Sequence, residues 1–145
     1  MGVNFPHEFT YEEMTVSQTA ARKGIDNKPT GAALTNLAKT AGNMVAVRLL
    51  LGNKPIIVSS GYRSPALNAV VGGSDTSAHT LGFAVDFTCP GFGTPLQIAK
   101  YIEQSGLQYD QLIHEFNSWV HISFDPRMRR QELTITSSGT VTGLH

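Results

Sequence analysis

The sequence predicts an α+β protein with a small antiparallel sheet flanked by helices. Two observations lead to this class. Helix signals come first along the chain, and strand and helix signals then mix, without the regular strand–helix alternation of a parallel sheet. A hairpin signal, Asn117-Ser118, also joins two strand-like runs. With 145 residues and no internal repeat, residues 1–145 are expected to form one domain.

The first part of the chain indicates two helices and a strand. Thr10 followed by Glu13 has the spacing of a capping box and predicts a short helix over 9–14. Apolar residues spaced three and four apart predict a long helix over 30–51. The β-branched run PIIVSS then predicts a buried strand over 55–60.

The middle of the chain alternates short helices, loops and one strand. Pro65 stands where a first helical turn tolerates proline, which predicts a short helix over 65–71. A glycine-rich loop over 72–78 follows it. The alternating apolar run over 83–88 predicts a strand, and the Thr-Pro start of 94–105 predicts a helix.

The last part of the chain indicates β-structure. Strands are predicted over 108–116 and 119–124, on either side of a tight turn at Asn117-Ser118. The core of the domain is expected to cover about 9–124. The remaining segment, 125–145, forms a second hairpin or a loose tail.

Charge and cysteine content exclude several classes. Eleven basic residues balance eleven acidic ones, and this neutrality argues against a general nucleic-acid binder, which needs a basic surplus. Cys89 is the only cysteine, so neither an intrachain disulfide nor a zinc site of several thiolates can form. Any metal site must therefore use histidines and carboxylates.

The N-terminal and apolar segments argue against export and membrane insertion. The N-terminus has no basic start, no apolar stretch and no small-residue cleavage site, so no secretory signal is expected. The longest apolar-rich stretch, 44–51, contains Arg48 and is far too short to span a bilayer.

Two histidines and an aspartate have the chemistry of a metal site. Asp86 lies inside an apolar strand, where a buried carboxylate is costly without a partner such as a cation. His121 lies in another apolar strand, and His79 ends the glycine-rich loop. Two imidazoles and one carboxylate can hold zinc and leave one position for water. The alternative for each histidine alone is a hydrogen-bonded residue of the core.

A composite of short motifs resembles the M15 metallopeptidases, which are D-Ala-D-Ala carboxypeptidase-like enzymes that include phage endolysins. The motifs are SGYRS at 60–64, then Asn68, then SAHTLGFAVD at 77–86 and WVH at 119–121. The resemblance implies the fold shared with the hedgehog signalling domain. It also implies one zinc ion held by His79, Asp86 and His121.

The resemblance also implies roles for residues around the metal. In this family an arginine matching Arg63 holds a substrate carboxylate or carbonyl, for which its planar fork is suited. Ser77 matches a serine that orients the first histidine or touches the substrate, and its alternative role is a plain cap of the loop. Many members place a carboxylate three residues before the last histidine, but this chain has Ser118 there. The phage-type branch instead points to Glu115 as the general base.

The length of the hairpin turn decides between two candidates. A two-residue turn would place His114 opposite His121 and point Glu115 away. A three-residue loop or a bulge would bring Glu115 opposite His121. With the tight turn, His114 becomes the group that contacts the substrate or shuttles the proton. Trp119 either lines the substrate groove or packs under the sheet.

These observations predict a zinc-dependent peptidoglycan peptidase, acting as a monomeric phage endolysin that cuts stem peptides or cross-links. Such a protein waits in the host cytoplasm and acts on the periplasmic cell wall after lysis. Two alternatives remain. One is a D-Ala-D-Ala carboxypeptidase or dipeptidase, and the other is a non-catalytic, zinc-containing binding domain like hedgehog.

Overall fold

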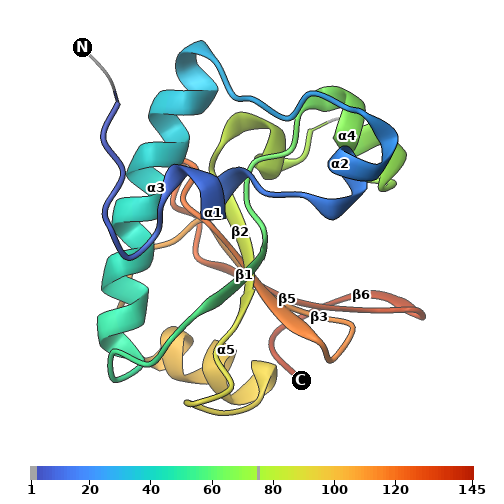
Figure 1. Ribbon diagram of the computed structural model, residues 1–145. Coiled ribbons are helices and arrows are strands. Elements are labelled where there is room, and N and C mark those ends of the chain that lie inside the picture. The colour runs from blue at the N-terminus through green and yellow to red at the C-terminus, as the bar shows by residue number, and fades with distance from the viewer. Residues whose placement is uncertain (1–2, 75) are drawn as a thin grey trace.

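The computed structural model describes residues 3–74 and 76–145 and shows one sheet surrounded by helices (Figure 1). The helices are α1 (Tyr11–Thr15), α2 (Gln18–Lys23), α3 (Gly31–Leu50), α4 (Pro65–Val70), the 3-10 helix η1 (Ala78–Leu81) and α5 (Pro95–Gln104). The strands are β1 (Ile57–Ser60), β2 (Ala84–Thr88), β3 (Gln111–Glu115), β4 (Trp119–Ser123), β5 (Gln131–Thr136) and β6 (Gly139–Thr142). None of the helices described combines the length and apolar character that crossing a membrane requires.

The six strands follow the order β1-β2-β4-β3-β5-β6. All neighbours run antiparallel except β3 and β5, which are parallel. The α+β class is confirmed, but a purely antiparallel sheet is wrong. The physical reason is that the chain reverses direction between β4 and β5, while both edges of β4 are already paired, with β2 and with β3. β5 therefore pairs on the outer side of β3, in the same direction as β3.

One face of the sheet carries the hydrophobic core. Side chains alternate between the two faces of a strand, and every second residue of β2, β3 and β4 points toward α3 and α5. The residues on this core face are Val85, Phe87, Leu112, Val120 and Ile122, and they pack with Leu37, Ala41, Met44, Val47, Ile98, Ala99 and Ile102 of the two helices. The opposite face of the sheet is thereby left for polar groups.

Two short helices were not expected from the sequence. α2 begins after Ser17, whose hydroxyl accepts a hydrogen bond from the Ala20 N–H, and η1 begins after Ser77. Helices of six and four residues are too short to show an apolar periodicity. Thr30 is the N-cap residue of α3 as expected, but its side chain makes no capping hydrogen bond.

The C-terminal segment is part of the sheet and not a loose tail. β5 and β6 form a hairpin, and Leu144 is buried against the core. The segment is also held by Arg129, whose guanidinium donates two hydrogen bonds of 2.8 Å to the carboxylate of the buried Asp110. These hydrogen bonds lower the pKa of Asp110. The structural domain therefore extends beyond residue 124.

Candidate metal centre

His79, Asp86 and His121 converge on the polar face of the sheet. Asp86 in β2 and His121 in β4 are direct register partners, so their side chains leave the sheet side by side. His79 reaches them from η1. One candidate ligand atom from each residue lies within 4.8 Å of the others, and all three residues are buried. The structure thus brings together the three residues whose chemistry suggested a metal site.

The hydrogen bonds of His79 show that a cation fits this cluster. Its Nδ1 lies 2.7 Å from the carbonyl oxygen of Gly61, which only accepts, so Nδ1 donates. Burial lowers the pKa of His79 and favours the neutral ring, whose Nε2 then carries a lone pair. Nε2 is buried, forms no hydrogen bond to any described residue, and lies 3.2 Å from Asp86 Oδ1. Two facing acceptors repel each other unless a cation lies between them, as zinc would.

The carboxylate of Asp86 is the centre of the cluster. Its Oδ1 also lies 2.9 Å from His121 Nδ1. Burial alone would raise the pKa of Asp86, but its interactions with His79 and the hydrogen bond from His121 hold it well below its usual range. For His121 burial acts in the other direction and lowers the pKa, because it disfavours the charged ring. The hydrogen bond and the charge of Asp86 outweigh burial, so the pKa of His121 is raised. Asp86 Oδ1 therefore lies between the two histidines, 3.2 Å from His79 Nε2 and 2.9 Å from His121 Nδ1.

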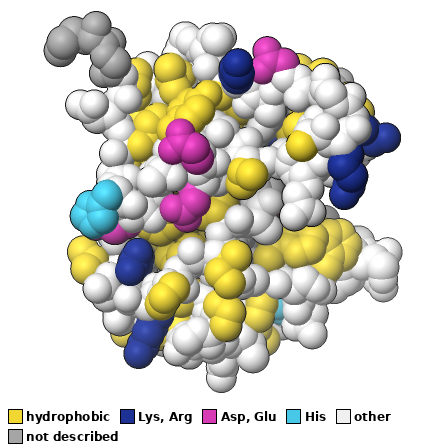
Figure 2. All heavy atoms as spheres, in the orientation of Figure 1, with side chains coloured by type: hydrophobic (Ala, Val, Ile, Leu, Met, Phe, Trp, Pro, Cys, Tyr) yellow, Lys and Arg dark blue, Asp and Glu magenta, His cyan; other side chains and the backbone are white. Residues whose placement is uncertain are grey.

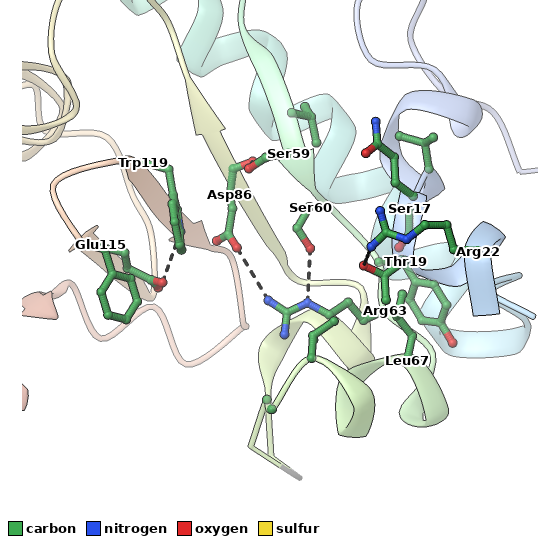
Figure 3. Close-up of a pocket in the computed structure, with 18 residues that line it drawn as sticks. Ser17, Thr19, Arg22, Ser59, Ser60, Arg63, Leu67, Asp86, Glu115 and Trp119 are labelled. Carbon is green, nitrogen blue, oxygen red and sulfur yellow. Dashed lines mark hydrogen bonds and ion pairs between the residues drawn. The ribbon is translucent and has the colours of Figure 1, made fainter. Parts of the chain in front are cut away.

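Arg63 is held in place beside the cluster (Figure 3). It follows β1 in the turn before α4, and its Nη2 lies 3.6 Å from Asp86 Oδ2. Its Nε donates to the hydroxyl of Ser60 at 3.2 Å, and its Nη1 donates to the buried Asn68 Oδ1 at 3.0 Å. Ser60 and Asn68 thus hold the guanidinium beside Asp86, where it lines the adjoining cleft.

The β3–β4 hairpin has a three-residue loop, so the two-residue turn at Asn117-Ser118 is wrong. Glu115 pairs with Trp119, and the Ser118 N–H donates to the Glu115 carbonyl at 2.9 Å. Phe116 and Asn117 both have positive φ angles, of 53° and 54°. The turn is therefore centred one residue earlier than expected, which changes the side chains that share the face of His121.

Glu115 faces the metal cluster as a result. It is not opposite His121, whose partner in β3 is Ile113, but it lies on the same face one pair farther along. Glu115 Oε1 is 3.8 Å from His121 Nδ1, and Oε2 accepts a 3.1 Å hydrogen bond from the indole N–H of Trp119. Burial and the charge of Asp86 raise the pKa of Glu115, which makes its carboxylate a better proton acceptor.

His114 does not reach the metal cluster, whereas Ser77 contacts the backbone of His79. His114 points to the opposite face from His121, because neighbouring residues of a strand alternate, and its Nδ1 lies 2.9 Å from the carbonyl of His145. The structure therefore does not bring His114 to the cluster. The Ser77 hydroxyl accepts from the backbone N–H of His79 at 3.2 Å, so Ser77 caps η1.

A cleft of about 820 Å³ runs past the cluster. Glu115 and Trp119 lie at one end and Arg22 of α2 at the other (Figure 3). Phe116 also lines the cleft. Basic side chains gather over α2 and hydrophobic ones along β3 and β5 in Figure 2. Sequence reasoning left the place of Trp119 open and did not single out Phe116. The signal available for both was their position on either side of a hairpin turn next to an acidic residue.

The glycine of the SAHTLGFAVD segment has a packing role. Gly82 has a φ of 82°, and an added Cβ would lie 2.4 Å from the backbone oxygen of Ala33 in α3. We expect Gly82→Ala to lower the free energy of unfolding by about 2–4 kcal/mol, because backbone strain adds to a clash with backbone atoms. Urea denaturation measures this loss.

Gly24→Ala is the matched control for this prediction. Gly24 also has a positive φ, of 64°, but an added Cβ would meet no atom within 4 Å. Its substitution should cost only the backbone strain, about 1–2 kcal/mol. Equal losses in the two variants would show that the contact between η1 and α3 is not the reason for glycine at position 82.

Comparison with known proteins agrees with this geometry. The profile of the peptidase M15 family matches residues 7–123, which include the candidate ligands, Arg63 and Glu115. The zinc D-Ala-D-Ala carboxypeptidase of Streptomyces albus G is 36% identical over 81 residues. That match covers 56% of this chain and 31% of the relative, so the chain spans about a third of that protein. Because the family profile matches well over half of the chain, the protein belongs to the peptidase M15 family.

Proposed function

We propose that the protein is a zinc-dependent peptidase that hydrolyses the peptides of bacterial peptidoglycan. One observation carries the proposal: the Glu115 carboxylate lies 3.8 Å from His121 in a cleft that also contains Asp86 and Arg63. A proton acceptor beside a His–Asp–His cluster is the arrangement that metal-assisted hydrolysis of an amide needs. His79, Asp86 and His121 would hold the ion.

The side chains of this site divide the chemistry among them. Zinc, when bound, supplies a Lewis acid that polarises a carbonyl and lowers the pKa of water. Glu115 accepts the proton of the attacking water and donates it to the leaving nitrogen. Trp119 holds the Glu115 carboxylate through Oε2 and leaves Oε1 toward the cluster. Arg63 binds a carbonyl or carboxylate of the substrate.

We propose endopeptidase activity on stem peptides or cross-links. The cleft continues past Arg63 to Ser17, Thr19 and Arg22, so its length supports a substrate that extends on both sides of the metal. The name of the Streptomyces relative supports the second candidate, a carboxypeptidase that removes terminal D-Ala.

Mass spectrometry of digested peptidoglycan separates these two candidates. Purified zinc-loaded protein should release stem peptides or split cross-links, which gives fragments of several residues. Loss of one terminal alanine alone would identify a carboxypeptidase. Intact peptidoglycan after prolonged incubation would contradict both and favour a non-catalytic zinc domain of the hedgehog type.

We further propose that the protein acts as a phage endolysin, held in the host cytoplasm until lysis exposes the periplasmic wall. Support comes from the resemblance of residues 110–121 to the phage-type branch of the family. A monomer suffices for this role, because one chain supplies the whole site: His79, Asp86, His121, Arg63 and Glu115. Added protein should lyse outer-membrane-permeabilised cells, and unchanged turbidity would contradict the role.

A further inference from the structure

Phe116 combines two features that are unusual for a phenylalanine. It is 47% exposed, and its backbone is left-handed, with a φ of 53° at the first central position of the β3–β4 turn. Such positions favour glycine, asparagine or aspartate, because a Cβ strains the backbone there. The strain is fixed by the fold, since the Phe116 N–H donates at 2.7 Å to the carbonyl of Ile135 in β5. Neither local conformation nor core packing explains phenylalanine at this position.

The ring of Phe116 belongs to one wall of the cleft. Its centroid lies 5.5 Å from that of Trp119, with the ring planes tilted by 46°, and both residues line the cleft. We call this pair the aromatic wall. The same Trp119 donates its indole N–H to Glu115, so the wall adjoins the proposed proton donor to the leaving nitrogen. Arg63 lies on the other side of Asp86 from Glu115 (Figure 3).

We propose that the aromatic wall is a specificity determinant, and that Phe116 packs on the apolar part of the substrate residue that follows the scissile bond. This inference rests on the proposed peptidase function. Glu115 can protonate the leaving nitrogen only within hydrogen-bond distance, so the residue bearing that nitrogen must lie beside the wall. Packing a ring face on an aliphatic group of the substrate removes apolar surface from water and contributes binding free energy. This contribution accounts for an exposed phenylalanine kept in a strained turn.

Stability and substrate selection should respond differently to Phe116→Asn. Asparagine tolerates the left-handed backbone, so the melting temperature should stay unchanged or rise by about 2–4 °C. In contrast, kcat/KM for a stem pentapeptide should fall about four- to tenfold, the effect of one or two lost aliphatic contacts. Asn117→Gly is the matched control, because it relieves a φ of 54° in the same turn at a residue that does not line the cleft. This control should keep wild-type kcat/KM.

A pair of substrates tests the contact between Phe116 and the substrate residue that follows the scissile bond. The bond cut in the peptide L-Ala-γ-D-Glu-L-Lys-D-Ala-D-Ala is located first by mass spectrometry, and the residue after the cut is then replaced with glycine. Wild-type protein should prefer the parent peptide about four- to tenfold, and Phe116→Asn should lose most of this preference. Trp119 is the only tryptophan, so its fluorescence also reports binding of both peptides to zinc-loaded Glu115→Gln protein, without turnover.

The outcomes separate this inference from the proposed function. Cleavage by wild-type protein with the same glycine penalty in Phe116→Asn would overturn the role of Phe116 alone. A fall in melting temperature parallel to the loss of activity would also overturn it, because the ring would then be structural. Failure of wild-type protein to cleave any peptide would overturn the proposed function and this inference with it.

Discussion

Glu115→Gln is expected to lower kcat/KM on peptidoglycan peptides by about 10³-fold or more while the protein stays folded and binds zinc. The amide keeps the shape of the side chain but can neither accept the proton of water nor return it to the leaving nitrogen. General acid–base groups contribute about 10²–10⁴-fold, and Glu115 serves both steps of the proposed reaction. Steady-state kinetics on a purified stem peptide, together with zinc quantification, measure the effect.

The pH dependence of stability provides the control for Glu115→Gln. Burial raises the pKa of Glu115 in the fold, so the ionised side chain opposes folding at neutral pH. Metal-free Glu115→Gln should therefore melt no lower than wild type at pH 7. The stability advantage of Glu115→Gln should shrink as the pH falls below the raised pKa, and it should vanish below the ordinary pKa of a glutamate, where Glu115 is protonated in both states. Retained activity in this variant would contradict the role of Glu115 as the base.

Asp86→Asn is expected to abolish the stabilisation that zinc gives to the protein. Zinc at about 1,000 times its dissociation constant should stabilise the wild-type fold by about 4 kcal/mol, or about 10 °C in melting temperature. Asp86 is the carboxylate that both histidines approach, and its loss removes one of three candidate ligands. Thermal melts with zinc and with a chelator should show a large shift for wild type and little or none for Asp86→Asn.

Asp110→Asn is the matched control for Asp86→Asn. Asp110 is also a buried aspartate with an arginine partner, but it lies outside the metal cluster. Its substitution should lower the melting temperature with and without zinc, because Arg129 loses a charged partner. The shift on adding zinc should remain. A zinc shift of wild-type size in Asp86→Asn would contradict the ligand role of Asp86.

Much of the site could be predicted because its residues sit in elements with strong local signals. Asp86 and His121 each interrupt an apolar strand, and a polar group at such a position needs a partner when it is buried. Period-two alternation then indicated which residues share a face. The short helices α2 and η1 escaped because a single turn carries no periodicity, although Ser17 and Ser77 cap them.

The parallel pairing of β3 and β5 could not be predicted either. A sequence pattern shows that a strand exists, but the free edge it joins depends on which strands already occupy the sheet. Long-range packing sets the strand order, and the residues between β4 and β5 carry no sequence pattern that predicts it. The place of the C-terminal hairpin was undecided for the same reason.

The sequence by itself indicated the candidate donor set, His79, Asp86 and His121, through residue chemistry and its resemblance to the M15 family. It also indicated the α+β class, because helix and strand signals are local properties. Tertiary structure alone decided that Glu115 and not His114 faces this set. The choice depends on one residue of turn length, since a shift of one position moves every side chain of a strand to the other face. That length was settled by the pairing of β3 with β4 and by the hydrogen bond from Phe116 to β5, both of which the fold provides.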